Sequence, residues 1–208
     1  MGAFKEPHGG ELIQLYVESS AVEQIKQESK DFKSWDLTDR QLCDLELILN
    51  GAFSPLDGFL TQAEYDSVLK DMRLPNGTLW PMPITLDVNE EFAASLAANE
   101  KIALRDAEGV LIALLEVTDN WVPDKEAEAV SAFGANDDKH PAVHYLHNIA
   151  GAVYLGGKLT GVEKPTHYDF KLLREDPAEV RTRFEKLGWR KVVAFQTRNP
   201  LHLSLIHI

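Results

Sequence analysis

The stretch Val192-Val-Ala-Phe-Gln-Thr-Arg-Asn-Pro-Leu-His202 contains the strongest fold signal in this chain of 208 residues. Together with Lys191 before it, the stretch opens as a short β-branched run that ends at Phe195, which is typical of a buried strand. A polar turn follows, and Pro200 suits the first turn of a helix. In open α/β sheets, ligands bind beyond the carboxyl ends of the strands, where helix N-termini present free N–H groups to anions. The stretch therefore predicts an anion-binding turn between a buried strand and a helix.

The side chains of this turn suit a tetrahedral oxyanion. Arg198 carries a planar fork that can form two parallel, charge-assisted hydrogen bonds. Gln196 and Asn199 can donate amide N–H groups. His202 can donate to a phosphate and offset the charge that develops during phosphoryl transfer. Judged from the residues alone, a plain polar loop between a strand and a helix is an equally good interpretation.

The residues before this turn predict a change of architecture. A helix is expected over residues 176–187, with Asp176 as its cap. Residues 163–174 have the mixed polar composition of a linker. The chain before the linker is rich in strand and turn signals. We therefore expect one domain over residues 1–165 and the start of a separate α/β unit over residues 170–202.

Local signals predict further elements within the first domain. Thr38 and Gln41 have the spacing of a capping box. Two runs of strand-forming residues flank a four-residue turn that ends in Gly109. Pro141 suits the first turn of a helix. These signals predict a helix over residues 38–50, a hairpin of residues 101–105 with 110–117, and a helix over residues 140–149.

Weaker signals give three more expectations. The run over residues 80–88 is broken by prolines, which indicates an edge strand or an irregular strand. The pair Gly156-Gly157 is interpreted as the end of the region that includes the helix predicted over residues 140–149. Asp57 and Asp87 are both expected in turns, as solvated carboxylates.

The composition indicates a globular protein and disfavours several classes. Hydrophobic residues make up 44% of the chain and charged residues 26%, and the formal net charge is -12. Such an acidic chain has no electrostatic footprint for nucleic acid or an anionic membrane. Cys43 is the single cysteine, which rules out an internal disulfide, and its helix-patterned neighbours predict that it is buried. No apolar run approaches the ~20 residues of a membrane span, and the N-terminus has no signal core, so we expect a cytoplasmic location.

Three histidines of the helix predicted over residues 140–149 share one helical face. They are His140, His144 and His147. This spacing could hold a metal ion. We favour the alternative, in which these histidines are exposed and bind no metal.

The run Ala194-Phe-Gln-Thr-Arg-Asn-Pro-Leu-His202 resembles the nucleotide-binding signature of the ATP sulfurylase family. Earlier segments resemble the N-terminal domain of the same family, namely residues 7–10, 37–46, 50–59, 83–87 and 140–142. The similarity covers roughly residues 5–202. It implies a mixed α/β protein, in which a PUA-like, strand-rich N-terminal domain is followed by the beginning of a Rossmann-like nucleotidyltransferase domain.

The resemblance implies a sulfate adenylyltransferase of sulfate assimilation, which converts ATP and sulfate to adenosine 5′-phosphosulfate and pyrophosphate. A sulfate oxygen attacks the α-phosphate and pyrophosphate leaves, so the protein acts by positioning and by stabilising charge. The resemblance assigns sulfate binding to Gln196 and Arg198, ATP binding to Gln196, Thr197, Arg198 and Asn199, and catalysis to Thr197, Arg198, Asn199 and His202. It implies no metal held by protein ligands, because Mg²⁺ arrives with ATP. The intact protein is expected to be a homo-oligomer.

Residues 203–208 depart from the family pattern. The family continues after His202 with Arg-Ala-His, whereas Leu205 stands at the second histidine position here. The run Leu-Ser-Leu-Ile-His-Ile is also what a common sequencing adapter encodes, so we interpret it as an assembly artefact. A genuine, divergent terminus is the alternative. We expect the 208-residue chain to be inactive alone, because one strand cannot build a doubly wound sheet.

Two other functions stay open at this point. A PUA-like fold could by analogy bind RNA, although the acidic composition and the segment 196–202 argue against it. RNA binding that weakens steeply with salt would identify that function. The chain could also be a non-catalytic partner of a full-length sulfurylase, and copurification with one would identify that role.

Overall fold

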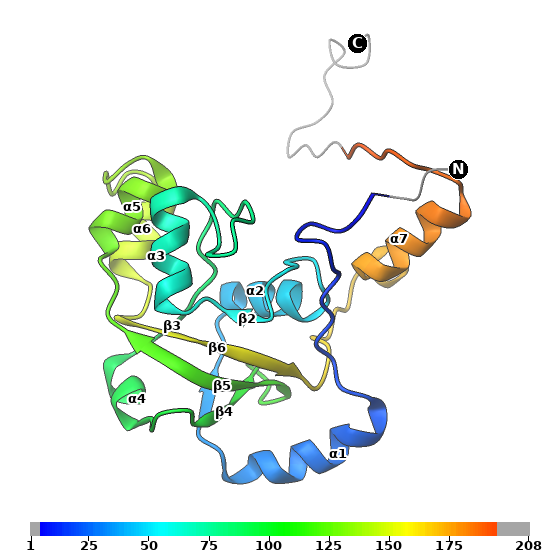
Figure 1. The fold of residues 1–208 in the computed structure, drawn as a ribbon. Coiled ribbons are helices and arrows are strands. Elements are labelled where there is room, and N and C mark those ends of the chain that lie inside the picture. Colours follow the sequence, from blue (N-terminus) through cyan, green and yellow to red (C-terminus); the bar gives the residue numbers. More distant parts are fainter. Residues whose placement is uncertain (1–4, 195–208) are drawn as a thin grey trace.

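The computed structural model describes residues 5–194, which form a mixed α/β fold around a six-stranded sheet (Figure 1). The strands are β1 (Ser34–Asp36), β2 (Gly58–Phe59), β3 (Leu86–Val88), β4 (Lys101–Arg105), β5 (Leu111–Trp121) and β6 (Val153–Gly161). The α-helices are α1 (Ser19–Glu28), α2 (Asp39–Leu49), α3 (Gln62–Asp71), α4 (Glu90–Ser95), α5 (Lys125–Phe133), α6 (Pro141–Asn148) and α7 (Pro177–Lys186). Two 3₁₀ turns are η1 (Ser29–Asp31) and η2 (Lys171–Leu173). None of the helices in this part of the chain is long and apolar enough to cross a membrane.

Strands β5 and β6 form the centre of the sheet. The strand order is β1-β4-β5-β6-β2, and β3 also pairs with β6. β1 pairs with β4 in parallel, and the other named strands pair antiparallel. The register of β5 against β6 shifts between Val117 and Asp119, opposite Gly157 and Gly156. A bulge of this kind bends a strand and increases its twist.

Helices cover both faces of the sheet, with α1 on one side and α2 on the other (Figure 1). On the α2 side, Leu45 and Ile48 are fully buried in the larger core cluster. On the α1 side, Leu114 of β5 packs in a smaller cluster with Ile25 of α1. Because both faces are covered, β5 is buried over residues 111–115 without the alternation of a half-exposed strand.

The elements predicted from local signals are present. Helix α2 begins after Thr38, whose hydroxyl accepts a hydrogen bond from the Gln41 backbone N–H at 3.3 Å, while the Gln41 side chain accepts one from Thr38 N at 3.0 Å. β4 and β5 form the predicted hairpin, but β5 continues to Trp121. The helices predicted near residues 140 and 176 are α6 and α7. The proline-broken run ends in the short strand β3, which pairs only with β6 among the described strands.

The interpretation of Gly156-Gly157 as the end of the region that includes the helix over residues 140–149 is wrong, because both glycines lie inside β6. The neighbouring backbone comes too close for a side chain. A Cβ at Gly157 would lie 2.0 Å from the carbonyl oxygen of Glu116, and one at Gly156 would lie 2.5 Å from that of Leu60. Consecutive glycines normally weaken a strand, so the pair predicted an interruption. The close approach of the neighbouring backbone instead requires glycine at these two positions of the strand.

The strand predicted over residues 191–195 is absent in its described part. Residues 191–194 have no regular structure, and Val193 is 94% exposed. A buried parallel strand depends on neighbouring strands and on cover for both faces. Within residues 5–194, no strand pairs with this segment. Phe195 lies outside the described residues.

Cys43 is exposed, so the expectation that it is buried is wrong. The buried residues of α2 are Gln41, Leu45, Ile48 and Leu49. Cys43 lies between two of these buried positions in sequence but off the helical face that they share, since successive residues of a helix point in different directions.

Side-chain contacts attach the linker to the first domain. The Nε2 atom of His167 lies 2.8 and 2.9 Å from the two carboxylate oxygens of Glu46 on α2. Lys26 of α1 forms an ion pair with Glu163. These contacts hold the beginning of the linker against α1 and α2.

Candidate functional site

The predicted anion-binding residues lie outside the part of the chain that the structure describes. They are Gln196, Thr197, Arg198, Asn199 and His202. The tail interpreted as an artefact, residues 203–208, lies outside it as well. Helix α7 and residues 187–194 lead up to this segment.

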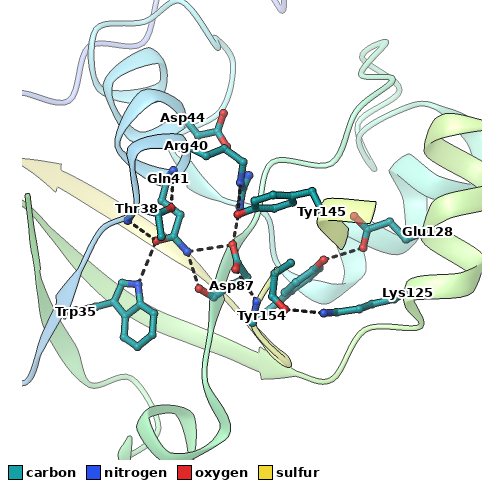
Figure 2. A network of polar contacts seen from close by, with 12 residues as sticks. Trp35, Thr38, Arg40, Gln41, Asp44, Asp87, Lys125, Glu128, Tyr145 and Tyr154 are labelled. Carbon is teal, nitrogen blue, oxygen red and sulfur yellow. Dashed lines mark hydrogen bonds and ion pairs between the residues drawn. The ribbon is translucent and has the colours of Figure 1, made fainter. Parts of the chain in front are cut away.

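Within residues 5–194, a polar cluster surrounds the carboxylate of Asp87 in β3 (Figure 2). Asp87 is only 5% exposed. One of its carboxylate oxygens accepts hydrogen bonds from Arg40 Nη2 at 2.5 Å and from Gln41 Nε2 at 3.0 Å. The other accepts one from the Gly151 backbone N–H at 2.7 Å. Asp87 thereby fastens α2 to β3 and to the turn before β6, and these partners offset the cost of burying its charge.

Each of the three guanidinium nitrogens of Arg40 donates a hydrogen bond. Its Nε donates to the Tyr145 hydroxyl at 2.9 Å, and its Nη1 donates to Asp44 at 2.8 Å. Nη2 is the group bonded to Asp87. The guanidinium carbon also lies 5.1 Å from the centroid of the Tyr145 ring. Because each nitrogen already has an anionic or hydroxyl partner, Arg40 works here as a structural link between α2, β3 and α6.

A second buried carboxylate, Glu128 of α5, lies nearby and is 5% exposed. Its Oε2 accepts hydrogen bonds from the hydroxyls of Tyr65 at 2.8 Å and Tyr154 at 3.0 Å. Burial raises the pKa of Glu128 and outweighs the opposing effect of these two hydroxyls. Lys125 of the same helix donates to the Ala150 carbonyl at 2.8 Å, and burial lowers the pKa of its amine.

The two carboxylate clusters border one cavity of about 340 Å³. Its lining comes from α2, residues 82–85, α5, α6 and the beginning of β6. Arg40, Asp44 and Glu128 supply the charged part of the lining, and most of the other lining residues are apolar. The described part of the chain therefore offers an apolar cavity with carboxylates at its edge.

The expectation that Asp87 is a solvated turn residue is wrong, whereas Asp57 does lie in an exposed position. The Asp57 side chain is 52% exposed and pairs with Lys158. Both aspartates directly follow a leucine, with a proline two residues before Asp57 and four residues before Asp87. The difference comes from Arg40 and Gln41, which lie 47 and 46 residues away in the chain, so local sequence could not reveal it.

His140, the N-cap of α6, and His144 and His147 within α6 are all exposed, and the first two have separate contacts. His144 Nδ1 lies 3.1 Å from an Asp138 carboxylate oxygen, and the ring of His140 stacks on Phe133 with centroids 5.8 Å apart. In the described residues, no group of three or more histidine, cysteine, aspartate or glutamate side chains could hold a metal ion.

Replacing Glu128 by glutamine is expected to change how stability depends on pH. The raised pKa means that the folded state retains this proton where the unfolded chain, with an ordinary pKa of about 4.3, has lost it. Wild type therefore loses stability relative to Glu128→Gln as pH rises above that value. The glutamine amide oxygen can still accept from both tyrosines, but the side chain cannot ionise. Urea unfolding at about pH 4 and about pH 7 measures the free energy of unfolding of both proteins. If the difference between them stayed constant with pH or changed in the opposite direction, the raised pKa of Glu128 would be contradicted.

Comparison with protein families gives two adjoining matches. A PUA-like domain matches residues 5–164. An ATP-sulfurylase family matches residues 171–207. The second match includes the turn from which the anion site was predicted.

Individual relatives cover nearly the whole chain. A sulfate adenylyltransferase of Eremothecium gossypii is 48% identical over 197 residues, which are 94% of this chain and 39% of the relative. One of Mycosarcoma maydis is 50% identical over 200 residues, or 94% of this chain and 35% of the relative. One of Saccharomyces cerevisiae is 48% identical over 199 residues, or 94% and 39%. The chain thus spans well under half the length of these relatives.

A solved structure has a similar fold. It is described as a hexameric APS kinase from Thiobacillus denitrificans. The TM-score is 0.76 at 34% sequence identity, over 97% of this chain and 36% of that one. The similarity again covers one part of a longer protein.

Proposed function

The chain belongs to the PUA-like domain family over residues 5–164 and is similar to ATP sulfurylases over residues 171–207, and from this we propose that the whole protein is a sulfate adenylyltransferase. The observation that carries the proposal is the identity of 48–50% to enzymes of that name over 94% of this chain. The proposed reaction converts ATP and sulfate to adenosine 5′-phosphosulfate and pyrophosphate. Since the chain covers only 35–39% of these relatives, the reaction is proposed for the full-length protein.

The proposed site is the turn over residues 196–202. Gln196 and Arg198 bind sulfate, and Gln196 to Asn199 line the ATP site. Thr197, Arg198 and Asn199 contact the reacting groups, and His202 offsets the charge that develops in the transition state. The support for these roles is the match of this segment to the ATP-sulfurylase family and the suitability of the residue types for oxyanions.

The proposed partners follow from the reaction. They are ATP, sulfate, adenosine 5′-phosphosulfate and pyrophosphate, with Mg²⁺ carried by the nucleotide. We propose a place in sulfate assimilation, a cytoplasmic location and a homo-oligomeric assembly. The last of these is supported by the hexameric description of the similar solved structure.

Replacing Arg198 by alanine in the full-length protein is expected to lower kcat/KM for sulfate about 100-fold or more, because the group that would clamp the oxyanion is lost. Arg198→Lys should recover only part of the loss, since an ammonium keeps the charge but not the two parallel bonds. Arg174→Ala is the matched control, because Arg174 is an exposed arginine paired with Asp169. Release of pyrophosphate with and without sulfate measures all three variants. Equal activities of Arg198→Ala and Arg174→Ala would show that the anion site has been misplaced.

A further inference from the structure

We propose that the cavity between α2, α5 and α6 binds a small amine, with the amino group at Glu128 and an apolar, ring-sized body in the rest of the cavity. This is a binding function in the PUA-like domain. It is separate from the turn proposed to bind sulfate and ATP.

The size and walls of the cavity fit a small organic molecule. Its volume of about 340 Å³ lies within the range of natural ligand pockets, ≈ 300–1,000 Å³. Phe133, Ile84 and Leu146 line it together with Met82 and Pro83. Ligand pockets are mostly apolar with a few placed polar groups, and this cavity has that composition.

Glu128 has one carboxyl oxygen that accepts no hydrogen bond from the described residues. Its Oε2 accepts from both Tyr65 and Tyr154. Its Oε1 has no hydrogen bond to any residue in the range 5–194, although Glu128 lines the cavity and is 5% exposed. Oε1 is not one of the fully buried side-chain atoms that lack a partner in the described residues, so water reaches it as an open acceptor. A donor from a bound molecule would satisfy it.

The charges at the cavity select a donor over an anion. Asp44 bonds Arg40 through Oδ2 alone, so its other oxygen is a second available acceptor among the described residues. The nitrogens of Arg40 are all engaged with Asp44, Asp87 and Tyr145. Lys125 donates to the Ala150 carbonyl. Of the charged residues in the described lining of the cavity, Asp44 and Glu128 are acidic and Arg40 is basic. A protonated or neutral amine complements this lining better than an anion does.

Benzylamine is the probe for the test, with benzoate as the probe of equal size and opposite charge. Both are titrated into the 208-residue chain labelled with ¹³C at the methionine methyl groups. The Met82 signal lies at the cavity and should shift in a saturable way with benzylamine. Met72 does not line the cavity and serves as the internal reference. Benzoate should bind at least about tenfold more weakly.

Two substitutions on the same helix locate the site. Ala142→Phe fills the cavity, because Ala142 lines it from α6, and should weaken benzylamine binding at least about tenfold. His147→Phe adds a similar ring on an exposed position of α6 and should leave binding unchanged. Glu128→Gln keeps the shape but places an amide NH2, which cannot accept from an amine, where Oε1 was, and should weaken binding about tenfold.

Several outcomes would overturn the proposal. These are a Met82 signal that benzylamine does not shift, benzoate binding as tight as benzylamine binding, and equal affinities of Ala142→Phe and His147→Phe. Glu128→Gln tests the proposed amino-group site by itself, because glutamine is similar in size to glutamate and the cavity keeps its volume. Wild-type affinity in that variant would show that the acceptor role of Glu128 is wrong.

Discussion

Replacing Asp87 by alanine is expected to destabilise the fold by about 3 kcal/mol, the lower end of what breaking a buried ion pair costs. The substitution leaves Arg40 and Gln41 without their shared acceptor and the Gly151 N–H without its partner. A buried polar group whose hydrogen-bond partner is removed destabilises the folded state by the full free energy of its desolvation. The lower end applies because the Arg40 side chain is 39% exposed and water can reach it. Urea unfolding at neutral pH measures the change.

Asp57→Ala is the matched control for this experiment. Its carboxylate is 52% exposed and its partner Lys158 is 74% exposed. Exposed ion pairs of this kind contribute about 0–1 kcal/mol. Should Asp57→Ala and Asp87→Ala cost the same, Asp87 would not be the residue that fastens α2 to β3 and β6.

Replacing Gly58 by alanine is expected to cost at least about 3 kcal/mol and to abolish soluble expression if the fold cannot adapt. A Cβ at Gly58 would lie 1.8 Å from the carbonyl oxygen of Gly157. The obstacle is backbone of the central strand β6, so no side chain can rotate away from it. The pairing of β2 with β6 would have to separate.

Gly109→Ala distinguishes this steric effect from the general cost of losing a glycine. Gly109 has φ +83° and nothing within 4 Å of an added Cβ. Its substitution should cost only about 1 kcal/mol, because the left-handed conformation is strained for alanine. Urea unfolding compares the two variants, and a Gly58→Ala protein as stable as Gly109→Ala would contradict the close approach of β2 to β6.

The parts of the fold that sequence could predict are those encoded by neighbouring residues. The capping box of Thr38 and Gln41 fixes the beginning of α2, and the turn ending in Gly109 fixes the hairpin of β4 with β5. Strand β6 was not predictable in this way. Its glycines are required because backbone of β5 and of the segment after β2 lies too close for a side chain. Such contacts between distant segments leave no pattern in the local sequence.

The polar cluster was not predictable from local sequence either. Asp87 acquires its role from Arg40, Gln41 and Gly151, which are 46 to 64 residues away in the chain. Glu128 is defined by Tyr65 and Tyr154, 63 and 26 residues away. The anion-binding turn, by contrast, is a continuous segment. Its residue types and its family resemblance could therefore be read directly from sequence, and its geometry lies outside the described residues.

The most direct test of the proposed activity is the formation of adenosine 5′-phosphosulfate by the protein expressed from the full reading frame. That frame is obtained by sequencing the source DNA across the codons for His202 and Leu203 from a primer well upstream. Product and pyrophosphate are measured with ATP and Mg²⁺ present, with and without sulfate, and the 208-residue chain is assayed beside it. We expect the full-length protein to form both products in equal amounts, only when sulfate is present, and the 208-residue chain to form neither. A full-length protein that forms no adenosine 5′-phosphosulfate, or that releases pyrophosphate equally without sulfate, would contradict the proposed activity.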